Sequence, residues 1–216
     1  MIRSLVKRFA SFVMWVVSKL YPLGLSQRLS SKRNQLYTLW IRHFLGDMGE
    51  CTQIEYPCHL QGGALKHIRI GHHTSIKSHV VLGCWDHYDA YNGRQTFSPE
   101  VIIGSHCYIG EYTQITACSR ITIGDYLLTG RYVYIGDNSH GGFSVEESSI
   151  PPVQRELRSK GEIVIGNKVW IGDKATILSG VHIGNHVIVA ANAVVLSDVP
   201  DNCMVAGVPA RIVKQL

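Results

Sequence analysis

The chain has 216 residues, of which 45% are hydrophobic and 17% charged, with 21 glycines and six cysteines. This length suits one main domain with an appendage, and the composition is that of a globular protein. The six cysteines show no C-x-x-C spacing. A disulfide framework is therefore disfavoured, and buried free thiols in a reducing compartment are expected.

The net charge of +5 is unevenly distributed. Residues 1–46 hold eight Lys and Arg and no Asp or Glu, which leaves 13 basic and 16 acidic residues for 47–216. The basicity is thus a property of the N-terminus alone. This argues against a nucleic-acid-binding core and points to an anionic surface that the N-terminus meets.

Residues 1–48 are predicted to form a basic amphipathic helical segment. A helix fits residues 2–20, Pro22-Leu23-Gly24 breaks it, and a second helix is expected at about 30–46. The run 9–17, which is apolar apart from Ser11, is nine residues long. Roughly 20 are needed to span a bilayer. We therefore expect a cytoplasmic protein, with peripheral association at the inner face of the membrane as an alternative.

Three interpretations of this N-terminus compete. A cationic amphipathic helix with Trp and Phe can lie in the membrane interface. Alternatively, the helices cap an end of the main domain or pack on a sister subunit. A signal peptide is disfavoured, because Ser18-Lys19-Leu20-Tyr21 supplies no small-x-small cleavage site after Val17.

The rest of the chain, 49–216, is organised by a six-residue repeat that is clearest from Ile163 to Arg211. Every sixth residue is a branched aliphatic, and a second apolar column follows four residues after each. The main column is Ile165, Ile171, Ile177, Ile183, Val189 and Val195, and the second is Val169, Ala175, Val181, Val187, Ala193 and Val199. A period of six matches neither a helix nor a simple strand, so it indicates a repeat architecture.

Short strands and corners explain this period. Apolar residues at i−2 and i point the same way along a strand, and the Gly, Asn, Asp and Ser that follow tolerate tight corners. Three hexads close a triangular coil, and stacked coils bury the columns. The sequence therefore predicts an all-β solenoid, a parallel β-helix. It is interrupted by excursions at 84–100 and about 137–162, and a two-residue slip before Ile123 implies a corner bulge. The aromatic and polar residues of the first excursion are candidates for lining an acceptor site.

The hexads and the ending Val205-Ala206-Gly207-Val208-Pro209-Ala210-Arg211 resemble those of the hexapeptide-repeat acyltransferases. The type that is most similar is the sugar or polysaccharide O-acetyltransferase, related to maltose, galactoside and xenobiotic acetyltransferases. The resemblance implies a left-handed β-helix, a homotrimer with sites between subunits, and acetyl-coenzyme A as co-substrate. It is close over 100–214 and looser over 50–100.

In this family the loop at the second excursion carries the catalytic histidine, and His140 is the matching position, within Asp137-Asn138-Ser139-His140-Gly141. A sugar hydroxyl needs a base to attack a thioester at neutral pH, and imidazole suits that role. Attack is direct in such enzymes. Asp137 is expected either to orient His140 or to bind the acceptor. An oxyanion donor is expected in a main-chain N–H near the corner after Gly172 of an adjacent subunit.

The resemblance also implies where the donor lies. The pantetheine arm would run over corners formed by small or main-chain-exposing residues, beside a Trp wall, with cations on the nucleotide phosphates. The matching positions are Trp170, Gly172, Asp173, Ala190, Ala191, Arg211 and Lys214. Many relatives have Thr-Lys where this chain has Leu196-Ser197, so one expected cation is missing.

Four histidines invite a metal site: His67, His72, His73 and His79. If every coil consists of three hexads, His73 and His79 face different sides, and no histidine stacks on His72, since positions 90 and 108 are Ala and Tyr. Solvated corner residues and no metal are therefore expected.

These features predict an O-acetyltransferase that moves an acetyl group to a hydroxyl of a sugar, polysaccharide or lipid-linked glycan. Two alternatives stay open. One is an N-acetyltransferase of amino sugars or an antibiotic-modifying relative, which would keep His140 and change the acceptor pocket. The other is a non-catalytic or metal-dependent β-helix, which would not bind coenzyme A.

Overall fold

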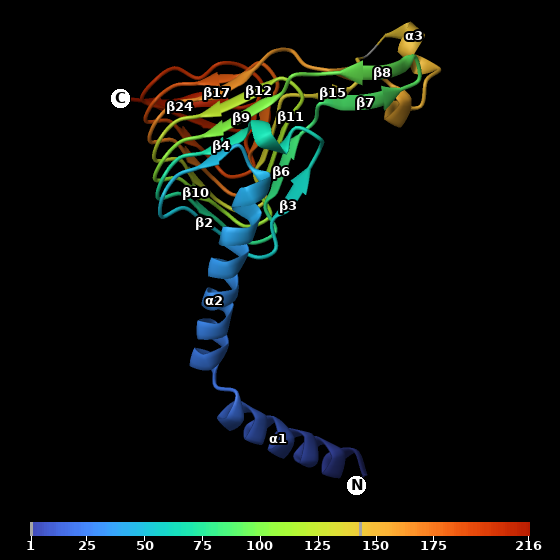
Figure 1. Ribbon diagram of the computed structural model, residues 1–216. Coiled ribbons are helices and arrows are strands. Elements are labelled where there is room, and N and C mark those ends of the chain that lie inside the picture. Colours follow the sequence, from blue (N-terminus) through green and yellow to red (C-terminus); the bar gives the residue numbers. More distant parts are fainter. Residues whose placement is uncertain (1, 143) are drawn as a thin grey trace.

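A computed structural model describes residues 2–142 and 144–216. Position 1 of the predicted N-terminal segment and position 143 of the predicted second excursion lie outside the described residues. Three parallel sheets form the sides of a prism, which is the predicted left-handed parallel β-helix (Figure 1). The division of the chain at residue 48 stays a prediction.

Each turn of the prism contributes one short strand to each sheet. The first sheet contains β1 (Asp47–Met48), β4 (Ile68–Ile70), β9 (Glu100–Ile103), β12 (Arg120–Ile123), β17 (Ile163–Ile165) and β20 (His182–Ile183). The second contains β2 (Gln53–Ile54), β5 (Ser75–Ile76), β10 (Tyr108–Ile109), β13 (Leu128–Thr129), β18 (Trp170–Ile171), β21 (Ile188–Val189) and β23 (Cys203–Ala206), and it ends with β24 (Arg211–Gln215), which folds back antiparallel to β23. The third contains β3 (His59–Gln61), β6 (Val81–Cys84), β11 (Gln114–Ala117), β14 (Tyr134–Gly136), β19 (Thr176–Leu178) and β22 (Val194–Val195).

The predicted aliphatic columns fill the interior of the prism. Ile165, Ile171, Ile177 and Val189 are at most 1% exposed, and the second column is equally enclosed apart from Val199 at 5%. Parallel register places each column residue directly over its equivalent in the next coil, as in the pairs Ile171↔Val189 and Ile177↔Val195. Burial of these stacked side chains is the main stabilising contribution to a solenoid.

The coils differ in length although the columns stay in phase. Trp170 pairs with Ile188 after a regular coil of three hexads, but Ser75 pairs with Tyr108 and Leu128 with Trp170. The two longer intervals hold the predicted excursions, both of which leave the prism between the third and first sheets (Figure 1). They contain β7 (His87–Ala90) and β8 (Gly93–Thr96), then β15 (Ser139–His140), α3 (Val145–Ser148), the 3-10 turn Pro152–Gln154 and β16 (Leu157–Arg158).

Two helices precede the prism, α1 (Ile2–Leu20) and α2 (Leu23–Ile41), followed by the 3-10 turns Arg42–Phe44 and, later, Leu65–His67. The second helix begins and ends earlier than the predicted range of 30–46. It begins directly after Pro22, whose extended backbone (ψ 153°) supplies the N-cap. Residues 26–35 are polar apart from Leu29, so this part of the helix shows no apolar periodicity.

The C-terminal half of α2 covers the first coil. The Thr38 hydroxyl accepts a hydrogen bond from the Ile54 N–H at 3.0 Å, and the Tyr37 hydroxyl donates to the Cys58 carbonyl at 2.8 Å. Ile41 is 1% exposed. One of the two predicted roles, capping an end of the β-helix, is therefore carried out by α2.

Helix α1 instead extends away from the prism (Figure 1). Between residues 3 and 20 every side chain is exposed except that of Val16, which is half-buried. Within the described residues no single helix is long and apolar enough to cross a membrane. The bent pair Arg3–Leu20 with Leu23–Phe44 meets those criteria only when taken together, with a 56° bend between its halves.

Candidate active site

His140 lies at the root of the second excursion. The third-sheet strand β14 ends at Gly136, and β15 follows it and pairs antiparallel with β16, so that His140 is opposite Leu157. The Gly141 N–H donates to the Glu156 carbonyl at 2.7 Å and continues this two-stranded ladder. The ladder fixes the backbone of His140, while its ring stays exposed beside the prism.

The first excursion contacts both strands of this ladder. The Gln95 side chain accepts a hydrogen bond from the Leu157 N–H at 2.7 Å and donates one to the Leu157 carbonyl at 3.3 Å. Tyr88 donates its hydroxyl hydrogen to the Val153 carbonyl. Its ring meets the His140 ring edge to face, with 5.3 Å between ring centroids. The predicted contribution of the 84–100 loop to a recognition site thus has a structural counterpart.

Two cavities adjoin β15. The first, of about 370 Å³, contains His140 and is walled by Trp85 and Tyr88 from the first excursion and by Tyr134 of the third sheet. The second, of about 540 Å³, is lined by Gly141 and Gly142 and by side chains of the later coils, including Leu178 and Leu196. Asn138 and Ser139 line both cavities. His140 lines the first cavity, and its neighbours in the sequence, Ser139 and Gly141, line the second, so the two cavities adjoin next to His140.

Asp137 is fully buried and belongs to the prism corner. Its two carboxylate oxygens accept hydrogen bonds from the main-chain N–H groups of Cys118 and Ser119, each at 2.8 Å. The Asn138 amide donates to it at 3.1 Å. Burial raises the pKa of the Asp137 carboxyl, and these donors oppose the rise. The carboxyl lines neither cavity, so acceptor binding by Asp137 has no support in this geometry.

The bulge predicted before Ile123 is the corner that Asp137 holds. Strand β11 ends at Ala117 and β12 begins at Arg120, so Cys118 and Ser119 form the turn. Tyr108 pairs with Leu128, so this coil is two positions longer than one of three hexads. Asp137 compensates for the longer turn by accepting both of its free N–H groups.

Two cysteines lie near the site, and neither is a competent nucleophile. Cys84 and Cys118 are buried, and burial raises the pKa of each thiol to about 12. A thiol with that pKa is almost entirely protonated at neutral pH, and the thiolate is the reactive form. This favours direct attack on a thioester over a cysteine-bound acyl intermediate.

The predicted donor residues gather on another edge of the prism. Gly172, Asp173, Ala190 and Ala191 form successive corners between the second and third sheets, and Trp170 is an exposed residue of β18 that precedes them. Arg211 and Lys214 are on the final strand, β24. None of these residues lines the two cavities beside His140. Their role therefore stays a prediction that requires a neighbouring subunit.

The main-chain N–H of Gly172 is not free to act as the expected oxyanion donor. The Gly172 N–H already donates to the Val189 carbonyl at 2.8 Å. A Cβ at Gly172 would lie 2.5 Å from the Ala191 nitrogen, so only glycine fits between these two coils. Gly172 is thus a packing residue of the corner, and any donor to an oxyanion has to come from a neighbour of Gly172.

The sequence indicated the aromatic and polar residues of the first excursion only as a group, and it singled out neither Gln95 nor Tyr88 nor Trp85. A glutamine in a non-repeating loop carries no periodic signal. The aromatic composition of residues 85–91 was the available indication.

The expectation that no histidine of a neighbouring coil lies at His72 was wrong. It assumed that every coil consists of three hexads, but the coil with the first excursion is longer, and His106 lies beside His72 and His73. The separation of His73 from His79 is confirmed, since they occupy different corners.

Comparisons with known proteins agree with this architecture. Residues 162–197 match the family model "Bacterial transferase hexapeptide (six repeats)". The chain is 34% identical over 169 residues to the "Putative lipopolysaccharide biosynthesis O-acetyl transferase WbbJ" of Escherichia coli K12, covering 76% of this chain and 79% of that protein. It is 32% identical to the galactoside O-acetyltransferase of Escherichia coli K12, covering 56% of this chain and 57% of that one.

A solved structure also resembles the chain. It is the hexapeptide-repeat-containing acetyltransferase of Vibrio cholerae O1 biovar eltor in complex with acetyl coenzyme A. The TM-score is 0.55 at 27% identity, and the match covers 90% of each chain.

Proposed function

Since the chain belongs to the bacterial hexapeptide-repeat transferase family, we propose that it is an O-acetyltransferase that uses acetyl-coenzyme A and acetylates a hydroxyl of a sugar or glycan. The relatives named as O-acetyltransferases and the acetyl-coenzyme-A complex support the donor and the reaction class. The observation that carries the proposal is that His140 lines one cavity while its neighbours Ser139 and Gly141 line a second, adjoining cavity.

His140 serves as the general base. The acceptor hydroxyl loses its proton to the imidazole while its oxygen attacks the thioester carbonyl, forming a C–O bond. The C–S bond then breaks, and the proton passes from the imidazolium to the departing coenzyme A thiolate. General base catalysis of this kind contributes about 10²–10⁴-fold to the rate. Asp137 acts as a positioning residue, because it anchors the corner from which β15 begins.

The acceptor is assigned to the cavity that contains His140. Trp85, Tyr88 and Tyr134 give it aromatic walls, and Gln61 and Gln114 add amide groups. Aromatic faces with a few polar groups suit a sugar ring, which has apolar C–H faces and a hydroxyl edge. The second cavity then faces the donor, whose pantetheine arm would come from the Gly172–Ala191 corners of the next subunit.

The first test replaces His140 with alanine. The His140→Ala variant is expected to lose acetyl transfer by about 10²–10⁴-fold and to keep coenzyme A binding. Transfer is measured as thiol release from acetyl-coenzyme A with a panel of nucleotide sugars and oligosaccharides. His182→Gln, an exposed histidine on the first sheet, is the matched control. Near-normal turnover by His140→Ala would overturn the assignment.

A second test asks whether the site lies between subunits of a trimer. Ala191→Trp is expected to fill the donor corner without touching His140, so both single variants are inactive. If they are mixed before assembly, about a quarter of the seams combine an intact His140 with an intact corner. Recovery to about a quarter of wild-type activity supports a shared site. No recovery, with mixed trimers shown by mass spectrometry, counts against it.

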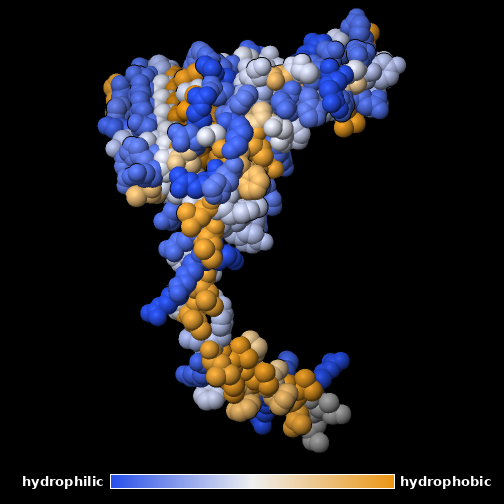
Figure 2. Space-filling model, in the orientation of Figure 1, coloured by the Kyte–Doolittle hydropathy of each residue, from blue (hydrophilic) through white to orange (hydrophobic). Residues whose placement is uncertain are grey.

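We infer that α1 rests on an anionic membrane surface. Its exposed apolar side chains include Phe9, Phe12 and Trp15, and hydrophobic surface covers much of α1 in Figure 2. Arg3, Lys7, Arg8 and Lys19 supply its charge, and no acidic residue precedes Asp47. Basic residues near such a surface contribute about 1 kcal/mol each.

Vesicle co-sedimentation tests this inference. The full chain is expected to bind vesicles that contain phosphatidylserine at low salt and to be released at high salt, while vesicles of phosphatidylcholine alone bind weakly. Phe12→Ser combined with Trp15→Ser should abolish binding, whereas Leu36→Ser on α2 should not. Equal binding by the double variant would contradict the inference and leave a protein partner as the occupant of α1.

A further inference from the structure

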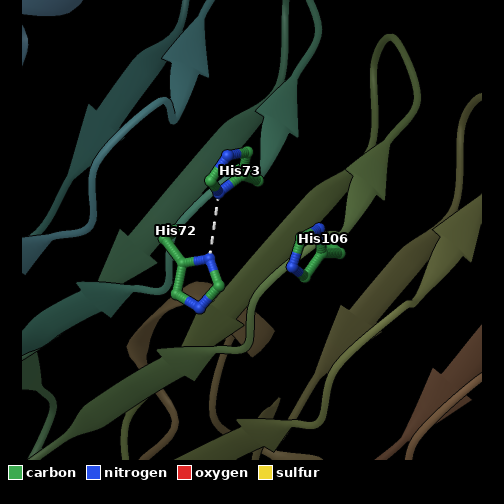
Figure 3. Close-up of side chains that lie close together, drawn as sticks. All are labelled: His72, His73 and His106. Atoms are coloured by element: carbon green, nitrogen blue, oxygen red, sulfur yellow. Dashed lines mark hydrogen bonds between the residues drawn. The ribbon is translucent and has the colours of Figure 1, made fainter.

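Three histidines meet at one corner of the prism, between the first and second sheets. His72 and His73 follow β4, and His106 follows β9 in the next coil (Figure 3). They are adjacent because Ile70 pairs with Ile103 across a lengthened coil that contains the β7–β8 excursion. This corner is distinct from the edge that carries His140, from which both excursions leave.

The ring nitrogens are close enough to share one ion. The Nδ1 atoms of His72 and His73 are 3.0 Å apart, and one nitrogen from each of the three rings lies within 4.8 Å of the other two. In a tetrahedral zinc site the nitrogens lie about 2.0–2.1 Å from the ion, which places them about 3.4 Å from one another. The three rings thus need only small side-chain rotations, and their exposure leaves the fourth position open to water.

The backbone holds the three positions firmly. The His106 N–H donates to the His72 carbonyl at 2.9 Å, and the His73 N–H donates to the Glu50 carbonyl at 2.9 Å. On its far side His106 stacks on Tyr126, with 4.9 Å between the ring centroids and 5° between the planes. Rotation about the side-chain bonds is therefore the only adjustment that binding requires.

Simple stacking of corner residues does not account for all three histidines. His73 and His106 have φ of 55° and 58°, and they belong to a column that continues as Tyr126 and Lys168. The neighbouring corner has the same kind of stacked column, formed by His79, Tyr112 and Tyr132, and this column contains one histidine among its three rings. His72 is outside either column.

The position of His72 is otherwise used for hydrogen bonding within the corner. In the following coils the equivalent residues include Asp125, Asn167 and Asn185, and each accepts a main-chain N–H from the coil before it. His72 instead turns its Nδ1 towards His73, as Figure 3 shows.

We propose that His72, His73 and His106 form a binding site for a divalent transition-metal ion of the zinc type. Imidazole nitrogens suit such ions, and three of them with an open fourth position form a recognised donor set. The ion would tie two coils together at the level where the first excursion leaves the prism. It takes no part in acetyl transfer, so the proposal stands independently of the proposed function.

The test is a titration of chelator-treated full-length protein with ZnCl₂ by calorimetry, and with CoCl₂ by its visible spectrum. One ion per chain is expected, with weaker binding at pH 6 than at pH 8 because protonated imidazole is not a ligand. At a hundredfold excess over Kd the thermal midpoint should rise by about 5 °C or more.

Matched variants identify the ligands. His72→Asn and His106→Asn are each expected to weaken binding by about tenfold or more, while the acetyl transfer rate is unchanged. Asparagine tolerates the positive φ of His106, so strain is avoided. His79→Asn at the neighbouring corner is the control and should bind like wild type. Equal affinity in the wild type and in the His72→Asn, His106→Asn double variant would overturn the proposal.

Discussion

Asp137→Ala gives the most direct test of how the prism corner supports the site. The carboxylate accepts the main-chain N–H groups of Cys118 and Ser119, and alanine leaves both without an acceptor. Each unsatisfied buried N–H costs about 1–3 kcal/mol, so the free energy of unfolding should fall by about 2–6 kcal/mol. With a slope of about 2 kcal/mol per molar urea, the unfolding midpoint moves down by about 1–3 M.

Asp137→Asn separates the hydrogen bonds from the charge. Asparagine keeps one acceptor oxygen and directs its amide donors at the second N–H, so an intermediate loss of stability is expected. Burial raises the pKa of Asp137 in the folded chain, so a proton is taken up on folding. The stability advantage of wild type over Asp137→Asn should therefore grow as the pH falls from neutral to about 4.

The kinetic effect follows from the same geometry. His140 lies only three residues after Asp137, so a loosened corner should displace His140 and lower kcat for acetyl transfer. Because the corner lies away from the predicted donor residues, the affinity of the variant for coenzyme A should equal that of wild type. Urea unfolding followed by circular dichroism, together with thiol-release kinetics, provides both measurements. If the Asp137→Ala midpoint matched that of wild type while transfer was abolished, the anchoring role would be refuted and a direct catalytic role favoured.

Two further predictions concern reactivity and the contact between the excursions. Ellman's reagent should titrate about one thiol per folded chain, Cys51, because the other five cysteines are buried, and burial raises the pKa of Cys58 to about 12. Rapid reaction of three or more thiols would contradict the described burial. Gln95→Ala removes two hydrogen bonds to Leu157, so limited proteolysis within 144–156 should speed up by about tenfold while the thermal midpoint stays nearly constant. Unchanged proteolysis would show that Gln95 does not hold the second excursion.

The architecture of the prism could be predicted from the sequence because its signal is repeated. Each aliphatic residue such as Ile171 is one of several equivalent residues in a column, and the corner position of Gly172 is likewise repeated in other coils. An error at one hexad therefore does not change the interpretation. The same redundancy allowed the two-residue slip before Ile123 to be recognised from the sequence, because the column of aliphatic residues resumes in phase after the slip.

Features that occur once were not predictable in this way. The contact of Gln95 with Leu157 depends on the shapes of two non-repeating loops. The cluster of His72 with His106 depends on how far the first excursion lengthens a coil. Counting in coils of three hexads aligned Tyr108 with His72, two coils earlier. In the structure Tyr108 pairs with Ser75, so the residues of each corner align with different partners from those expected. The stacking partners of a corner residue follow from coil length, which an insertion resets.

The insertions that lengthen two of the coils also explain why a site can form beside His140. The first excursion leaves after β6 and the second after β14, and only β11 lies between these strands in the third sheet. Neighbouring strands are about 4.8 Å apart, so the two roots are separated by about 10 Å, a gap that paired side chains and loop backbone readily bridge. Insertions on different edges of the prism would diverge, and insertions many coils apart would not touch. A cavity with aromatic walls is thus a consequence of two insertions on one edge, two coils apart, and its lining can vary without disturbing the buried columns.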